Sequence, residues 1–90
     1  MSNKVIFTMR GLNEYIYWQT EDKRTLKKIN SLIKDIIRNA KTGIGNPEPL
    51  KGNLVDNWSR EIDDKNRLIY VISDSGDIEI IQCKGHYGDK

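Results

Sequence analysis

The sequence predicts an α+β fold with the order strand, helix, helix and three antiparallel strands, in which the helices pack on one twisted sheet. Two observations predict this class. Between residues 26 and 40, apolar side chains recur every three or four positions, which is the spacing of one helix face. After residue 57, β-prone segments are separated by two short polar turns, which is typical of antiparallel strands. We therefore expect two helices near the start of the chain and a sheet built mainly after them.

The first elements are a short strand and a helix. Val5-Ile6-Phe7 is a β-prone apolar run, and Thr8 directly after it is a good helix cap. Helical spacing then continues through residues 12 to 19, with Trp18 near the end. The polar stretch Thr20-Glu21-Asp22 interrupts this helix and is predicted to start the next one.

The second helix is the clearest element of the chain. Its apolar residues share one face and are Leu26, Ile29, Leu32, Ile33, Ile36, Ile37 and Ala40. Lysines and arginines fall mainly between them, so the helix is predicted to bury one side and present charge on the other. We expect Gly43 and Gly45 to end it.

A loop and two hairpins complete the predicted fold. Residues 41–53 carry three glycines and both prolines, so we expect a stiffened loop in which the prolines fix how Glu48 projects. Residues 58–63 alternate as in a strand. The predicted turns are residues 63–66 and 74–77, and the strands that they connect are residues 67–72 and 78–83.

Length and composition predict a single domain comprising residues 1–90, because 90 residues leave no room for a second core. The 37% hydrophobic and 31% charged residues indicate a folded globular protein. No apolar run approaches the roughly 20 residues that cross a bilayer, and the start lacks the apolar core of a secretory signal, so we expect a cytoplasmic protein. With Cys83 as the only cysteine and a single histidine, we expect no internal disulfide, no metal site and no cofactor.

Positive charge is concentrated in one segment, although the net charge of the chain is only +2. Between residues 23 and 41 the basic residues are Lys23, Arg24, Lys27, Lys28, Lys34, Arg38 and Lys41. Asp35 is the one acidic residue there, so one face of the segment should form a positive stripe. Such a stripe is either an RNA-binding surface or the solvated side of an ordinary helix, and charge alone does not decide between them.

The residues with the clearest chemistry lie at the end of the chain and in the loop. His86 is the only histidine, and a free imidazole titrates near pH ~6.5, so it can exchange a proton at neutral pH. Tyr87 places an aromatic ring beside it. Glu48, Lys51 and Arg67 add a possible base and two cations, as an RNA-cleaving site requires. Taken singly, each also fits a plain structural role as a solvated or ion-paired side chain.

The combination of segments along the chain is its most specific feature. These segments are Tyr15–Gln19, Asp22–Arg24, Lys27–Asn30, Leu32–Asp35, Pro47–Lys51, Trp58–Arg60, Arg67–Leu68 and the terminal His86–Tyr87. Together they resemble the YoeB toxins of bacterial toxin-antitoxin modules, within the RelE/ParE superfamily of ribosome-dependent mRNA interferases. The resemblance implies a RelE-like fold and a catalytic set made of Glu48, Arg67, His86 and Tyr87. It also implies that Lys51 and Arg60 contact the substrate.

The resemblance further implies the partners of the protein. The ribosome would present mRNA in its decoding site, and the basic surface would bind ribosomal RNA phosphates. A cognate antitoxin of the YefM/Phd type would cover the toxin with a segment that folds on binding. A homodimer is also implied. One departure from the family pattern is Glu61, which stands where relatives commonly carry a second arginine.

The chemistry of RNA cleavage assigns a role to each of these side chains. The 2′-hydroxyl of RNA can attack the neighbouring phosphate without a metal ion if a base removes its proton and an acid protonates the leaving oxygen. Glu48 is the candidate base, His86 the candidate acid and Arg67 the group that grips the phosphate. An ordinary carboxylate is a weak base at neutral pH, so this role predicts that the fold buries Glu48.

Two other functions stay open at this point. Relatives of the same fold poison DNA gyrase, and such a toxin would need neither the acid nor the base. A domain with a basic helix and an exposed sheet could also bind RNA without cutting it.

Overall fold

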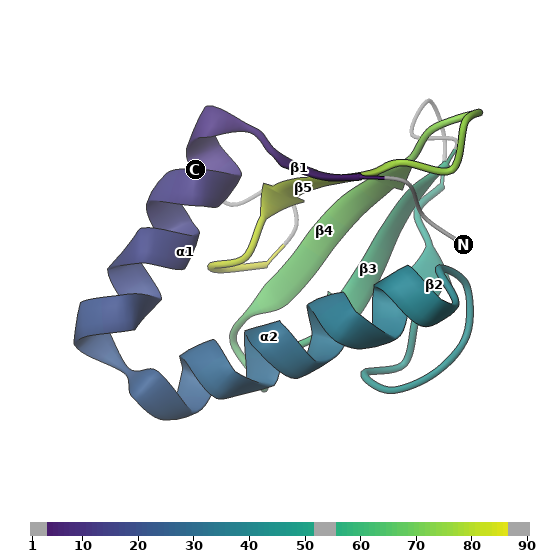
Figure 1. The fold of residues 1–90 in the computed structure, drawn as a ribbon. Helices are drawn as coiled ribbons and strands as arrows, with labels where there is room; N and C mark the ends of the chain where they lie inside the picture. The colour runs from purple at the N-terminus through teal and green to yellow at the C-terminus, as the bar shows by residue number, and fades with distance from the viewer. Residues whose placement is uncertain (1–3, 52–55, 87–90) are drawn as a thin grey trace.

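The computed structural model describes residues 4–51 and 56–86 of the chain. The elements in order are β1 (Val5–Phe7), α1 (Met9–Glu21), α2 (Lys23–Arg38), β2 (Glu48–Pro49), β3 (Asn57–Glu61), β4 (Arg67–Ile72) and β5 (Ile78–Gln82). The five strands form one sheet, and α2 crosses one face of it while α1 lies at the side of β5 (Figure 1). The predicted α+β class, with two helices packed on one sheet, is confirmed.

The sheet is mixed, with the strand order β1-β5-β4-β3-β2. The three later strands pair antiparallel as predicted, and β1 joins β5 in parallel. The sequence did not predict β2, because its two residues were expected to lie in a stiffened loop. Glu48 pairs with Ser59 and Pro49 with Trp58 at the edge of the sheet, where a proline does not interrupt a ladder.

Local caps begin both helices where the sequence placed them. The hydroxyl of Thr8 accepts a hydrogen bond from the Gly11 amide (3.0 Å), and the carboxylate of Asp22 accepts from Arg24 and Thr25 at the start of α2. The expected end of α2 is wrong, because the helix stops at Arg38 before either glycine. Neither helix in the described part of the chain has the length and apolar character of a membrane-spanning segment.

The core lies between α2 and one face of the sheet. Ile29, Leu32 and Ile36 of α2 are fully buried against a sheet surface that includes Leu68 and Tyr70. Because side chains alternate along a strand, the residues between these core positions point to the other side of the sheet. We call that side the distal face, and its members are Glu48, Asn57, Ser59, Glu61, Arg67, Ile69, Val71, Glu79 and Gln82.

Candidate functional site

A row of paired residues crosses the distal face and places Glu48. Glu48 lies opposite Ser59, Ser59 opposite Ile69, and Ile69 opposite Gln82, so the row spans four strands. Directly paired residues point to the same side of a sheet, so the carboxylate of Glu48 starts from the distal face. Glu48 is exposed, so the described residues do not supply the burial that its role as a base requires.

Arg67 lies on the same face, two strands away from Glu48. It pairs with Glu61, two residues along from Ser59, so strand spacing puts its Cα about 12 Å from that of Glu48. The residue is half-buried, and its Nη1 donates to the carbonyl oxygens of Asp63 and Asn66, in the turn between β3 and β4. Arg67 therefore stands between the row that contains Glu48 and the residue 63–66 turn.

His86 reaches the same turn from the end of the chain. Its Nε2 lies 3.1 Å from the carbonyl oxygen of Asp64, the residue after the one that Arg67 binds. The backbone beside it is fixed as well, because the Arg67 amide donates to the Gly85 carbonyl (2.9 Å). The fold thus brings the guanidinium of Arg67 and the imidazole of His86 to neighbouring carbonyl groups of one turn.

The other predicted site residues have different outcomes. Lys51 is exposed and lies two residues after the end of β2. Tyr87 lies outside the described residues. The substrate contact expected of Arg60 is wrong, because Arg60 has no exposed surface and lies on the core side of β3.

Arg60 is the centre of a buried hydrogen-bond network. Its Nε donates to the Tyr70 hydroxyl (3.1 Å), and one terminal nitrogen donates to the Asp35 carboxylate (2.5 Å) and to the Ile44 carbonyl (3.1 Å). The other terminal nitrogen donates to the carbonyls of Asn39 (2.8 Å) and Thr42 (2.9 Å). A guanidinium has five N–H groups, so this network uses all of them and leaves none for a phosphate.

The Arg60 network fixes the chain between α2 and β2. The Tyr70 hydroxyl donates to the Ala40 carbonyl (2.7 Å), and Asp35 accepts from the Ile44 amide (2.9 Å). Gly43, at φ 123°, packs so closely on Asp35 that a Cβ would overlap the carboxylate. The loop that leads to Glu48 is therefore tied to α2 and to the sheet by the same arginine.

This network predicts an acid-dependent loss of stability through Asp35. The hydrogen bond from Arg60 is the main cause that lowers the pKa of Asp35 below its ordinary value of 3.8. A lowered folded-state pKa contributes stability that is complete above the unfolded value and is lost as the pH falls toward the folded value. In urea unfolding, the advantage of wild type over Asp35→Asn should therefore be full at about pH 7 and should shrink below about pH 4. An advantage that stays constant down to about pH 2 would contradict this account.

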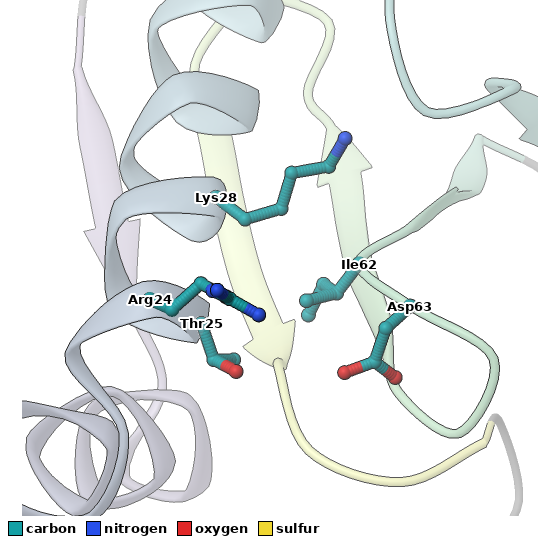
Figure 2. A pocket seen from close by; sticks show the side chains of 5 residues that line it. All are labelled: Arg24, Thr25, Lys28, Ile62 and Asp63. Atoms are coloured by element: carbon teal, nitrogen blue, oxygen red, sulfur yellow. The ribbon is translucent and has the colours of Figure 1, made fainter.

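Glu48, Arg67 and His86 line neither of two cavities that the described residues form. One, of about 240 Å³, lies between the first turns of α2 and the start of the residue 63–66 turn. Figure 2 shows both Arg24 and Lys28 extending from α2 into this pocket, with the guanidinium of Arg24 directed toward the side where Ile62 and Asp63 lie. The other, of about 470 Å³, is a largely apolar groove between β1 and the two helices, lined by residues that include Phe7 and Ile33. Within residues 4–51 and 56–86, no group of three or more His, Cys, Asp or Glu side chains is placed to hold a metal ion.

Comparison with protein families identifies the chain. The model of the YoeB-like toxin of bacterial type II toxin-antitoxin systems matches residues 7–87. A YoeB toxin from a Synechocystis species is 49% identical over 84 residues, which cover 93% of this chain and 96% of that protein. The YoeB toxin of Escherichia coli K12 is 46% identical, with 93% of this chain and 99% of that protein covered.

Solved structures give the same result. The YoeB/ParE toxin from Agrobacterium tumefaciens superimposes with a TM-score of 0.89 at 42% identity, covering 93% of this chain and 99% of that one. A YoeB dimer from Staphylococcus aureus gives 0.85 at 45% identity, and a YoeB-YefM complex from the same species gives 0.84 at 42% identity, each covering 93% of this chain and 97% of that one. The fold, the family model and the full-length relatives agree, and the chain belongs to the YoeB family of toxins of bacterial type II toxin-antitoxin modules.

Proposed function

We propose that this toxin is a ribosome-dependent endoribonuclease that cleaves mRNA in the decoding site of the ribosome and so inhibits translation. The observation that carries the proposal is the meeting of Arg67 and His86 at one turn, on the sheet face that also bears Glu48. A phosphate clamp, a proton donor and a carboxylate are the groups that metal-independent RNA cleavage needs. Membership of the YoeB family supports the same reaction class.

In the proposed reaction, Glu48 removes the proton of the 2′-hydroxyl of the RNA. The 2′-oxygen then forms a bond to phosphorus, the bond from phosphorus to the 5′-oxygen breaks, and His86 gives its proton to that oxygen. Arg67 holds the non-bridging phosphate oxygens as negative charge develops on them. The products are a 5′-hydroxyl and a 2′,3′-cyclic phosphate, which water can open to a 3′-phosphate. Lys51 adds positive charge near the phosphate, and Tyr87 stacks on a base.

The exposure of Glu48 supports a requirement for the ribosome. A carboxylate in water is a poor base, and closing a site over substrate removes that water. Within the described residues, Glu48 itself is exposed at the edge of the distal face. The covering surface must then come from the bound RNA and from the body that presents it, which agrees with cleavage of mRNA on the ribosome rather than of free RNA.

The charge of α2 supports a large RNA partner. The basic side chains of this helix are exposed, and Arg24 and Lys28 line the cavity next to the residue 63–66 turn (Figure 2). Exposed lysines and arginines of this kind bind phosphates, and each contact releases counterions, so binding weakens as salt rises. We propose that this surface contacts ribosomal RNA and that the toxin acts in the cytoplasm.

The partner proteins are proposed from the relatives. The Staphylococcus aureus relatives form a YoeB dimer and a YoeB-YefM complex. For this chain we propose a homodimer and a cognate antitoxin of the YefM/Phd type. The apolar groove between β1 and the helices, with Lys34 at its lining, offers a place for an antitoxin segment that carries both apolar and acidic residues.

Primer extension on a reporter transcript with purified ribosomes tests the proposal. Wild type should cut the transcript only when it is being translated, and Glu48→Ala should lower the cleavage rate by about 10²- to 10⁴-fold because the base is lost. Glu79→Ala is the matched control, since Glu79 is an exposed glutamate on the same distal face, on β5 rather than β2. It should cleave like wild type.

The same experiment separates the proposal from the two other functions. A gyrase poison would arrest growth without cutting the transcript, and Glu48→Ala would remain toxic. A non-catalytic RNA-binding domain would slow translation and give no new 5′ ends under any condition. Either pattern would overturn the proposed ribonuclease activity.

A further inference from the structure

A buried glutamine holds the segment that carries His86. Gln82 ends β5, and only 2% of its surface is exposed. Its side-chain nitrogen lies 2.7 Å from the His86 carbonyl oxygen, 3.2 Å from that of Lys84 and 3.4 Å from that of Gly85. An amide nitrogen has two N–H groups, so two protons are shared among three successive carbonyl groups of one turn.

Two further contacts hold the same turn at Gly85. The Gly85 amide donates to the side-chain oxygen of Asn66 (2.8 Å), and the Gly85 carbonyl accepts from the Arg67 amide (2.9 Å). Both contacts are made by the backbone of Gly85, the residue before His86. Among the residues that the structure describes, Gln82 binds the His86 backbone carbonyl, while the His86 imidazole lies against the Asp64 carbonyl.

A local irregularity of the sheet directs Gln82 to this task. Tyr70 pairs with Ile80, but Ile69, the residue before Tyr70 in β4, pairs with Gln82. Ile81 is therefore an extra residue in β5. Without this shift, Gln82 would lie on the same side of β5 as Ile80, two residues before it, and would point into the core. With it, the amide lies on the distal face under the residue 84–86 turn.

We propose that Gln82 is a positioning residue that holds residues 84–86 so that the imidazole of His86 stays beside Arg67. Its effect on cleavage rests on the proposed ribonuclease function, whereas its effect on the imidazole does not. Loss of the amide removes this donor from three carbonyl oxygens, of which that of Gly85 keeps the Arg67 amide, and the turn can then move at His86. A displacement of about 1 Å at a reacting group can cost up to about 10²-fold in rate.

The first test observes the imidazole without RNA. Because the chain has a single histidine, the imidazole gives one assignable set of NMR signals. Gln82→Met keeps the length of the side chain but removes its donors, and it should move the His86 signals toward those of a histidine in an unfolded peptide. Gln19→Met, at the chain's other glutamine, which is exposed on α1, should leave them in place. Unchanged His86 signals in folded Gln82→Met would overturn the proposal.

The second test measures cleavage under single-turnover conditions on ribosomes. Gln82→Met should lower the maximal rate by about 10- to 10²-fold, with little change in the toxin concentration that gives half of it. In a His86→Gln background, Gln82→Met should cause no further loss, because the group that it positions is gone. A loss of equal size in both backgrounds would show a general structural effect and overturn the proposal.

Folding and function are kept apart in both tests. If Gln82→Met does not fold, Gln82→Asn replaces it, since asparagine keeps the amide but is one methylene too short to reach the His86 carbonyl. Its imidazole signals should move in the same direction, and unchanged signals would again overturn the proposal. If wild type cuts no RNA at all, the ribonuclease function fails, and the NMR comparison still decides whether Gln82 holds His86.

Discussion

Replacing His86 by glutamine should lower the rate of mRNA cleavage on ribosomes by about 10²- to 10⁴-fold. Glutamine can still hydrogen-bond to the Asp64 carbonyl, but it cannot give a proton to the departing 5′-oxygen. His86 is exposed, so the substitution should change the free energy of unfolding by no more than about 0.5 kcal/mol. A single-turnover cleavage assay and a urea unfolding curve on the same preparation separate the two effects.

A neighbouring exposed residue provides the control for this substitution. Lys84 lies in the same turn as His86, and its ammonium group lies over the ring of Tyr17 on α1 (4.9 Å). Lys84→Gln should therefore cleave at nearly the wild-type rate. Cleavage by His86→Gln at the wild-type rate would remove the acid from the proposed reaction and would leave Arg67 and Glu48 without their partner.

The helices and the order of the later strands could be predicted because their signals are local. Thr8 and Asp22 cap helices by hydrogen bonds to residues two or three positions away, and the spacing of apolar residues defines the buried side of α2. The short strand β2 has no such signal. Glu48 and Pro49 are extended because β3 pairs with them, and this pairing depends on where the intervening chain brings them.

The role predicted for Arg60 was wrong because it was inferred from the charge of the side chain and not from its position in the strand. An arginine in a motif of an RNA-binding family suggests a phosphate contact. Arg60, however, is spaced two residues from Trp58 and from Ile62, and this spacing places it with them on the core side of β3. The alternation was the signal that could have found its structural role. Gln82 was missed for the opposite reason, because regular alternation points it into the core and only the extra residue Ile81 turns it toward His86.

Replacing Arg60 by methionine should lower the free energy of unfolding by about 3 kcal/mol, the lower end of the range for breaking a buried ion pair, because the Asp35 side chain is 24% exposed. The side chain is fully buried, and its loss leaves the Asp35 carboxylate with the Ile44 amide but without its cation, and removes the Arg60 donor from three loop carbonyls. Burial raises the pKa of Tyr70, so its hydroxyl stays neutral and adds no second negative charge beside the Asp35 carboxylate. A loss of this size is a large part of the roughly 5–15 kcal/mol that holds a small domain together.

Arg67→Met is the matched control, because it makes the same chemical change on the other side of the sheet. Arg67 is half-buried and donates to two carbonyls of the adjoining turn, so its loss should cost only about 1–2 kcal/mol of stability. Its loss should instead abolish most cleavage, since the phosphate clamp is removed. Urea unfolding should thus show the larger loss of stability in Arg60→Met, and the ribosome assay should show the larger loss of cleavage in Arg67→Met. If Arg60→Met were as stable as wild type and failed only in cleavage, Arg60 would be a substrate contact after all, and the buried network would not be what fixes the loop before Glu48.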